Sequence, residues 1–287
     1  MNRREDTYTG PKVICAGLPR TGTTSLHAAL KILNLHPCLH YTLITQEFFP
    51  YPQWRRWKKA LTLYGEQHKS TRQAILKEIF ERGHYAATLA YPAAIFVEDF
   101  VEMFPEAKFI HTTRASTEVW KRSVDEGMRR PVRRDVVREW LAVWTRLLKP
   151  GSLRPDLVEW GRRQFGAGYC DVDNARLYEC YNEFVKEVVP AGRLLADFDP
   201  GLGWGPLCEF LDMEVPVDEL GVPVEYPRLN DRAAVEYERK RRVLKGFISW
   251  AVVLGVGFGL AKLVIRLRRE HKSLVSFLIE LIPVRGL

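Results

Sequence analysis

The strongest constraint on the fold of this chain is a glycine- and threonine-rich loop near its N-terminus. The loop reads GLPRTGTTS from Gly17 to Ser25, directly after the apolar run KVICA and directly before a helical pattern that reaches about residue 33. In such a place, backbone N–H groups and the positive end of a helix point at a bound anion. The sequence therefore predicts an anion site where a buried β-strand ends and a helix begins.

Strand-like and helix-like segments alternate through the first 238 residues. Further strands are expected over 35–41, 85–89, 108–113 and 193–198. Helices are expected over 70–82, 93–103, 118–126, 136–148 and 206–211. This alternation favours an α/β fold, in which helices flank both faces of a parallel sheet of the P-loop type. We expect one α/β domain over 1–238, followed by a tail with a C-terminal apolar helix over 239–287.

The positive charge of the chain is concentrated in the tail. The whole sequence carries a formal net charge of +8, and the tail alone has 11 Lys and Arg against 2 Asp and Glu, which is +9. The preceding domain therefore carries −1. A near-neutral domain is poorly suited to nucleic acid, whereas a basic tail around an apolar segment suits a membrane surface. We predict a membrane partner and no nucleic-acid partner.

The apolar segment of the tail is long enough to span a membrane. Residues 246–261 are 16 residues without a charge, and the segment reaches 20 residues at Ile265 if Lys262 is included. Twenty helical residues rise about 30 Å, the thickness of the hydrocarbon core. The alternative is a buried hairpin or the helix of a homodimer, in which Gly255 and Gly259 would allow a close helix contact.

We expect this segment to cross the membrane once, with the preceding domain in the cytosol. The first ten residues contain no apolar run, so no secretory signal is predicted. Five basic residues precede the segment and four follow it, a small bias that places its N-terminal side in the cytosol. The five cysteines form no CxxC pair, which fits the reduced thiols of that compartment.

The N-terminal loop has the glycine spacing of a nucleotide-triphosphatase P-loop but lacks its lysine. That pattern requires Lys and then Ser or Thr after the second glycine. Thr23 and Thr24 stand there, and the basic residue of the loop, Arg20, comes earlier. The strand 108–113 also ends without the aspartate that would hold Mg²⁺. These departures weaken an ATPase or kinase interpretation and leave no requirement for a metal.

The loop instead resembles that of the P-loop sulfotransferases, whose donor is 3′-phosphoadenosine 5′-phosphosulfate (PAPS). Their loop reads PKSGTT or PRSGTT, and this chain has PRTGTT. The resemblance covers residues 12–231 in separate blocks, including the late segments 203–211 and 226–231. It implies that PAPS is the donor. It also implies that the 5′-phosphosulfate is held by Pro19, Arg20, Thr21, Gly22, Thr23 and Thr24.

The resemblance further indicates a site for the 3′-phosphate of PAPS. In the family, a strand that ends in Arg and a Ser near the start of the next helix bind this group. Arg114 and Ser123 are similar to this pair, and their guanidinium and hydroxyl groups suit a phosphate. Their spacing is one residue longer than in the family, which leaves Ser116 or Thr117 as the alternative hydroxyl. The segment 226–231 similarly implies that Arg228 completes the nucleotide site.

The chemistry of sulfuryl transfer asks for a cation and a base. Charge develops on the bridging oxygen of the leaving phosphate, and Arg20 is placed to stabilise it. A base must remove the proton of the acceptor. We assign this role to His40, expected at the end of a strand near the loop. Glu98 and Asp99 are the carboxylate alternatives. The family often has Asp two residues before the proline that stands at position 92 of this chain, where this chain has Ala90.

These features predict a sulfotransferase that moves a sulfuryl group from PAPS to a hydroxyl or amine of a small molecule or glycan. Two other functions stay open. One is a P-loop protein that binds nucleoside triphosphates. The other is a catalytically degenerate, membrane-anchored protein that binds nucleotide without turnover, because Ala90 and the longer spacing from Arg114 to Ser123 depart from the family.

Overall fold

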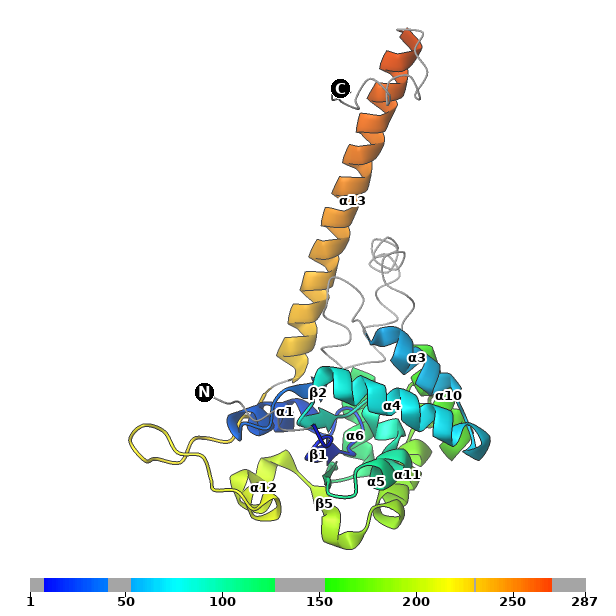
Figure 1. The fold of residues 1–287 in the computed structure, drawn as a ribbon. Helices are drawn as coiled ribbons and strands as arrows, with labels where there is room; N and C mark the ends of the chain where they lie inside the picture. The colour runs from blue at the N-terminus through cyan, green and yellow to red at the C-terminus, as the bar shows by residue number, and fades with distance from the viewer. Residues whose placement is uncertain (1–7, 41–52, 127–152, 230, 270–287) are drawn as a thin grey trace, which may run out of the picture. The chain divides into compact units, whose positions relative to one another are not determined.

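The computed structural model describes residues 8–40, 53–126, 153–229 and 231–269. Among these residues, one compact unit extends to Val235 and a second begins at Glu236. The helix expected over 136–148 lies outside the described residues. Figure 1 shows the first unit as a small sheet surrounded by helices. The expected α/β class is therefore confirmed.

A parallel sheet of five strands forms the centre of this first unit. Its strands run in the order β2-β3-β1-β4-β5, and each neighbouring pair is parallel. In chain order the strands are β1 Val13–Cys15, β2 Cys38–His40, β3 Ala87–Leu89, β4 Lys108–Thr112 and β5 Leu194–Phe198. Each strand is shorter than the segment from which it was predicted, because the apolar pattern continues past the last hydrogen bond of the ladder.

Helices connect these strands and cover the sheet (Figure 1). They are α1 Thr23–Ile32, α3 Trp54–Thr62, α4 Lys69–Gly83, α5 Val97–Met103, α6 Thr117–Val124, α10 Arg154–Phe165, α11 Ala175–Val188 and α12 Trp204–Leu211. The sequence patterns predicted α1, α4, α5, α6 and α12 but not α10 or α11.

Each face of the sheet carries its own hydrophobic core. In β1, the side chains of Val13 and Cys15 pack with α1 and α12, whereas Ile14 packs on the opposite face with the remaining helices of the unit. All three side chains are at most 2% exposed. Alternation between two covered faces follows from the two-residue repeat of a strand. It also explains why the strands consist mostly of apolar residues without a polar face.

The strand order places the functional loops at one edge of the sheet. Cys15 at the end of β1 pairs with Leu89 of β3 on one side and with Ile110 of β4 on the other. The segments that follow these three strands therefore emerge side by side at the carboxyl edge. Open parallel sheets bind their ligands at this edge.

A tyrosine of α11 ties two of these segments together. The hydroxyl oxygen of Tyr181 lies 2.7 Å from the carbonyl oxygen of Ala16, which begins the loop after β1, and 2.9 Å from that of Ala94. Ala94 belongs to a short 3₁₀ helix, Ala93–Ile95, that Phe96 separates from α5 because its φ of −105° and ψ of 33° are not helical. The helix predicted over 93–103 is thus divided.

The tail contains one long helix, α13 Asp231–Arg269. Within it, Trp250–Arg268 is long and apolar enough to cross a membrane. Many large apolar side chains of this helix are exposed, as a lipid-facing helix requires. They are Leu244, Phe247, Ile248, Val252, Leu254, Val256, Phe258, Leu260, Val264 and Ile265. The expected C-terminal apolar helix is therefore confirmed, whereas its crossing of a membrane remains a prediction.

Candidate functional site

The loop between β1 and α1 depends on two glycines. A Cβ atom at Gly17 would overlap the side-chain oxygen of Thr112 at the end of β4. Gly22 has a φ of +88°, which favours glycine, and a Cβ there would come within 2.7 Å of Pro200. The loop backbone therefore lies directly against Thr112 at the end of β4 and Pro200 after β5.

Hydrogen bonds to other residues of the loop fix its shape. The side chain of Thr21 is fully buried, donates a hydrogen bond to the carbonyl of Leu18 at 2.6 Å, and lies 2.6 Å from the hydroxyl of Thr112. The indole of Trp120 donates to the carbonyl of Pro19 at 3.0 Å. Pro19 is thus held through its carbonyl, and Thr21 holds the loop through its side chain.

The first turn of α1 is suited to an anion. Gly22 precedes it without a side-chain cap, and no acidic residue lies in that turn. The N–H groups of the first turn have no partner within the helix, and the helix dipole places partial positive charge there. Thr23 and Thr24 are the first two residues of this turn. They offer these N–H groups rather than side chains that line the adjacent cavity.

A cavity of about 530 Å³ opens beside the loop. Five of the predicted site residues line it: Arg20, Gly22, Arg114, Ser123 and Arg228. Residues predicted from four separate parts of the sequence thus meet at one cavity.

The cationic side of the cavity is built by hydrogen bonds between these residues. Arg20 Nε donates to the hydroxyl of Ser123 at 3.2 Å, and Arg114 Nε donates to the carbonyl of Arg20 at 2.7 Å. The backbone N–H of Arg114 donates to the hydroxyl of Tyr178 at 2.8 Å. The two guanidinium groups and the Ser123 hydroxyl are therefore held together before any ligand binds.

The structure also separates the three hydroxyl candidates near Arg114. Ser116 caps α6 by accepting a hydrogen bond from the N–H of Val119, and the Thr117 hydroxyl lies 3.1 Å from the carboxylate of Glu179. Both line a second cavity of about 400 Å³, which Arg114 also touches. Ser123 lies in the cavity of the loop despite the longer spacing, because one turn of α6 brings it back toward Arg20.

The segment that carries Arg228 is attached at both ends. The N–H of Leu229 donates to the Ser25 hydroxyl in α1 at 3.1 Å. Before Arg228, the ring of Tyr226 packs edge-on against Trp204, whose indole donates to the carbonyl of Val224 at 2.7 Å. Arg228 itself stays exposed. It reaches the cavity from a loop that α1 and α12 both hold.

Sequence reasoning missed several residues of the cavity. Arg122 of α6 adds a fourth guanidinium, and Asp199, Pro200 and Gly201 form the wall after β5. The Asp199 carboxylate accepts a hydrogen bond from the N–H of Gly201 at 2.8 Å, which shapes that turn. The available signal was an Asp-Pro-Gly turn directly after a predicted strand, since such a turn must lie at the carboxyl edge.

His40 ends β2, as predicted, but it is not among the residues that line the cavity. It is buried and stacks on His27 of α1, with ring centroids 5.0 Å apart and planes 13° apart. Burial, and to a smaller extent the positive charge of Lys31, lower the pKa of His40 to about 4. The imidazole is therefore neutral at pH 7, as a general base must be. Its role as the base remains a prediction.

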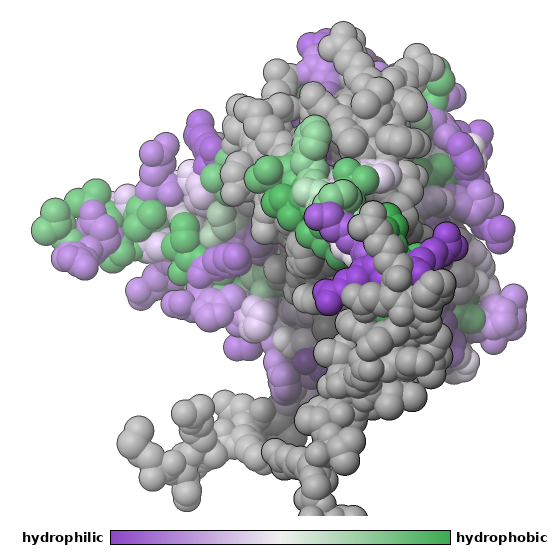
Figure 2. Space-filling view, turned by 90° about the horizontal axis from the view of Figure 1, so that it is seen from above, coloured by the Kyte–Doolittle hydropathy of each residue, from purple (hydrophilic) through white to green (hydrophobic). Residues whose placement is uncertain are grey.

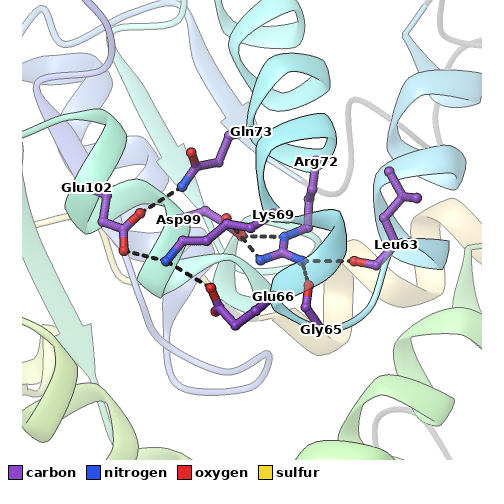
Figure 3. Close-up of polar contacts among 8 residues, drawn as sticks. All are labelled: Leu63, Gly65, Glu66, Lys69, Arg72, Gln73, Asp99 and Glu102. Atoms are coloured by element: carbon purple, nitrogen blue, oxygen red, sulfur yellow. Dashed lines mark hydrogen bonds and ion pairs between the residues drawn. The ribbon is translucent and has the colours of Figure 1, made fainter.

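The carboxylate alternatives differ sharply in their surroundings. Both carboxylate oxygens of Asp99 accept hydrogen bonds from Arg72, at 2.7 and 3.1 Å, and the same guanidinium donates to the carbonyls of Leu63 and Gly65 (Figure 3). Asp99 is 2% exposed and serves as an internal ion-pair partner. Glu98, the residue before Asp99, is exposed as a whole. Burial of part of its side chain nevertheless raises the pKa of its carboxyl.

Ala90 occupies a notable place at the carboxyl edge. It directly follows β3, between the ends of β2 and β1, and has a φ of +55°. Aspartate and asparagine adopt this conformation more readily than alanine. The backbone thus retains a geometry suited to the aspartate that the family resemblance implies, while the side chain is absent. Among the described residues, no group of three or more His, Cys, Asp or Glu side chains could hold a metal ion.

Comparison with known proteins gives three findings. Residues 12–235 match a family described as "Sulfotransferase domain". "Ava biosynthesis cluster protein M" of Aspergillus versicolor is 31% identical over 222 residues, covering 72% of this chain and 78% of that protein. A solved structure, "Crystal Structure of Sulfotransferase from Alicyclobacillus acidocaldarius", covers 81% of this chain and 94% of its own, with 14% identity and a TM-score of 0.34. Because the family match runs from the start of β1 into α13, the chain belongs to the sulfotransferase domain family.

Proposed function

We propose that this protein transfers a sulfuryl group from PAPS to a hydroxyl or amine acceptor. One observation carries the proposal: Arg20, Arg114, Ser123 and Arg228 line a single cavity beside a glycine-dependent loop. The family membership supports sulfotransferase chemistry, and the arrangement of the cavity supports a donor with two separate anionic groups.

The residues present fit such a donor. The loop and the first turn of α1 offer N–H groups and Arg20 to the 5′-phosphosulfate. Arg114 and Ser123, with Arg228 from the opposite loop, offer charged and neutral donors to the 3′-phosphate. The volume of about 530 Å³ lies within the usual range for small-molecule sites, about 300–1,000 Å³.

In this reaction the bond between sulfur and the 5′-phosphate oxygen breaks, and a bond from sulfur to the acceptor forms. Arg20 stays charged throughout and stabilises the negative charge that the leaving phosphate gains. His40, neutral at pH 7, takes the proton of the acceptor. No metal is required, because arginines and backbone N–H groups supply the positive charge.

The donor is tested by thermal stability with two nucleotides. We expect 3′,5′-ADP at about 100 times its Kd to stabilise the full chain by about 2.7 kcal/mol, which corresponds to about 5–10 °C in Tm. ATP with Mg²⁺ should have a smaller effect, since the loop lacks the lysine for its β- and γ-phosphates. Stabilisation by ATP and Mg²⁺ alone would instead support a triphosphate-binding protein.

Arg114→Ala is expected to weaken 3′,5′-ADP binding by about 1.5–3 kcal/mol, or about 10- to 150-fold in Kd. The variant loses a charged donor to the 3′-phosphate and the hydrogen bond that holds the carbonyl of Arg20. Calorimetric titration measures the change. Arg163→Ala is the matched control, since Arg163 is exposed, pairs with Glu159 and lies outside the cavity. Equal affinity in both variants removes Arg114 from the site.

Arg20→Ala is expected to reduce turnover by about 10²–10³-fold, the usual loss when one group that stabilises developing charge is removed. Initial rates with saturating PAPS measure this effect. Arg20→Lys should recover part of the rate, because it keeps the charge while losing the planar fork. If Arg20→Ala raises only KM and leaves kcat unchanged, Arg20 binds the donor without stabilising the leaving group.

One observation favours a second candidate, a degenerate family member that binds nucleotide without turnover. Ala90 stands at the carboxyl edge where the family resemblance implies an aspartate, and His40 does not line the cavity. This protein would bind 3′,5′-ADP as tightly as the enzyme but would not transfer sulfate to any acceptor. The transfer assay therefore separates the two candidates, whereas nucleotide binding does not.

We further infer that α13 crosses a membrane once and holds the α/β domain on its cytosolic side. The apolar segment within Trp250–Arg268 and the basic residues on both sides of it support this placement. Within the segment, the Nζ of Lys262 lies 4.7 Å from the centre of the Phe258 ring, one turn earlier in the helix. Membranes containing the full chain should retain it through a carbonate wash, and release by that wash argues against a crossing.

A further inference from the structure

We propose that the acceptor is a membrane-resident amphiphilic alcohol, which the enzyme sulfates at the bilayer surface. This proposal rests on the proposed PAPS-dependent function and on the proposed membrane crossing. It names the substrate class of the cavity described above. Three observations lead to it: the connection between the cavity and α13, the length of that connection, and the apolar side chains at the rim of the cavity.

The cavity and the membrane helix are neighbours in the chain. Pro227, Arg228 and Leu229 line the cavity, and α13 begins two residues after Leu229, at Asp231. The hydrogen bond from the N–H of Leu229 to the Ser25 hydroxyl fixes this segment on α1. In the sequence, a single residue therefore separates the cavity wall from the start of the helix.

The length of α13 limits how far the cavity can be from the bilayer. From Asp231 to the first uncharged residue of the span, Gly246, the helix rises about 22 Å. To Arg239, the first of the five basic residues before the span, it rises only about 12 Å. Because chain length alone sets these limits, they hold for any direction of the helix. They are comparable with the radius of gyration of a domain of this size, about 17 Å. The chain therefore limits how far the cavity residue Leu229 can lie from the apolar segment, and this limit is about the size of the domain itself.

The rim of the cavity offers apolar contacts. Val119 and Leu229 line it and are 43% and 51% exposed, and Leu202, next to the lining residue Gly201, is 63% exposed. A ligand with a hydrocarbon part would cover them while its hydroxyl enters the cavity.

The segment 212–226, between α12 and the lining residue Pro227, adds further exposed apolar side chains. It projects at the left of Figure 1, and Figure 2 shows hydrophobic residues at the tip of the same projection. A bridge between Val217 and Pro223 closes this turn, and the carboxylate of Asp218 accepts hydrogen bonds from the N–H groups of Leu220 and Val222. Leu220 is 87% exposed. This built turn thus presents apolar side chains on the chain segment that leads to the membrane helix.

The first experiment measures distance without using an acceptor. The full chain is placed in phosphatidylcholine vesicles that carry a fluorescent acceptor dye on some headgroups, and a fluorescent 3′,5′-ADP analogue is bound. A variant with 14 helix-forming residues inserted between Glu238 and Arg239 lifts the domain by about 21 Å. We expect strong energy transfer in the parent and a clear loss in this variant. The same 14 residues added after Leu287 form the control and should change nothing.

The second experiment measures the acceptor class. Turnover with labelled PAPS is compared for 1-hexadecanol in the vesicles and for 1-butanol in solution, two alcohols with the same reacting group. The parent should prefer hexadecanol. The internal insertion should lower that turnover by at least about tenfold, because the local concentration of acceptor at the cavity falls. It should leave butanol turnover and 3′,5′-ADP affinity unchanged.

Two results would overturn the proposal while leaving the sulfotransferase function intact. One is equal hexadecanol turnover in the parent and in the lifted variant, and the other is a preference for butanol in the presence of vesicles. Failure of the proposed function looks different, since it would appear as no binding of 3′,5′-ADP, or as binding without transfer to either alcohol. That outcome also removes the acceptor class proposed here.

Discussion

Replacing His40 with alanine is expected to lower turnover by about 10²–10⁴-fold, the usual contribution of a general base. The physical reason is that burial keeps the imidazole neutral, with a pKa of about 4, so the base is present at physiological pH. In the parent, turnover should therefore fall only when the pH drops through about 4, where the ring becomes protonated. Steady-state rates with saturating PAPS across a pH series measure both effects.

A matched variant separates catalysis from structure at this position. His27→Ala removes the ring that stacks on His40 but not the predicted base. If His40 is the base, His27→Ala should retain most of the turnover, and both variants should bind 3′,5′-ADP normally. Equal, small losses in the two variants would show that the pair only packs α1 against β2. The exposed carboxylate of Glu98 then becomes the better candidate for the base.

Asp99→Ala is expected to reduce the free energy of unfolding by about 3–5 kcal/mol, because it leaves a buried charge without its partner. Arg72 is 11% exposed in its side chain, and Asp99 accepts both of its ion-pair hydrogen bonds. This contact joins α4 to α5 and, through two carbonyls, fixes the turn after α3 (Figure 3). Urea denaturation of Asp99→Ala and of the parent chain measures the loss.

Glu102→Ala is the control for this prediction. Glu102 also lies on α5 and pairs with Lys69 of α4, but its side chain is 51% exposed, so its removal should cost less than about 1 kcal/mol. A variant Asp99→Ala that stays as stable as Glu102→Ala and yet loses turnover would contradict the structural role. Asp99 would then have to act on the acceptor.

Much of the site could be predicted because its chemistry depends on local sequence. A strand, a glycine loop and a helix are consecutive in the chain, so the anion site after β1 was visible without a structure. Arg114 was found for the same reason, since the end of a parallel strand lies at the edge where ligands bind. The strand expected over 108–113 contains His111, which is fully buried in β4.

Other features required the three-dimensional arrangement. The place of Ser123 depends on the turn of α6, and the contribution of Arg122 depends on which face of α6 looks into the cavity. Asp99 could not be distinguished from a catalytic carboxylate, because its partner Arg72 is 27 residues away in the sequence. The position of His40 outside the cavity lining also follows from the strand order, which inserts β3 between β2 and β1.

For the tail, the sequence predicted the presence of a helix but not the residue at which it begins. The helix itself was predicted from composition, because a long uncharged segment has few alternatives to a helix. Its start at Asp231, two residues after the cavity residue Leu229, could not be read from hydropathy, since residues 231–245 are strongly charged. This short separation in the sequence is what links the proposed donor site to a membrane acceptor.

The central claim is that the cavity binds PAPS and transfers its sulfuryl group. The most direct measurement follows release of 3′,5′-ADP and transfer of labelled sulfate in the same reaction, with the full chain in vesicles that contain candidate alcohols and amines. Our account predicts one 3′,5′-ADP for each labelled product, with both signals reduced together in Arg20→Ala. Binding of 3′,5′-ADP without any labelled product above the level of Arg20→Ala would contradict it and would identify the protein as a nucleotide-binding member of the family without turnover.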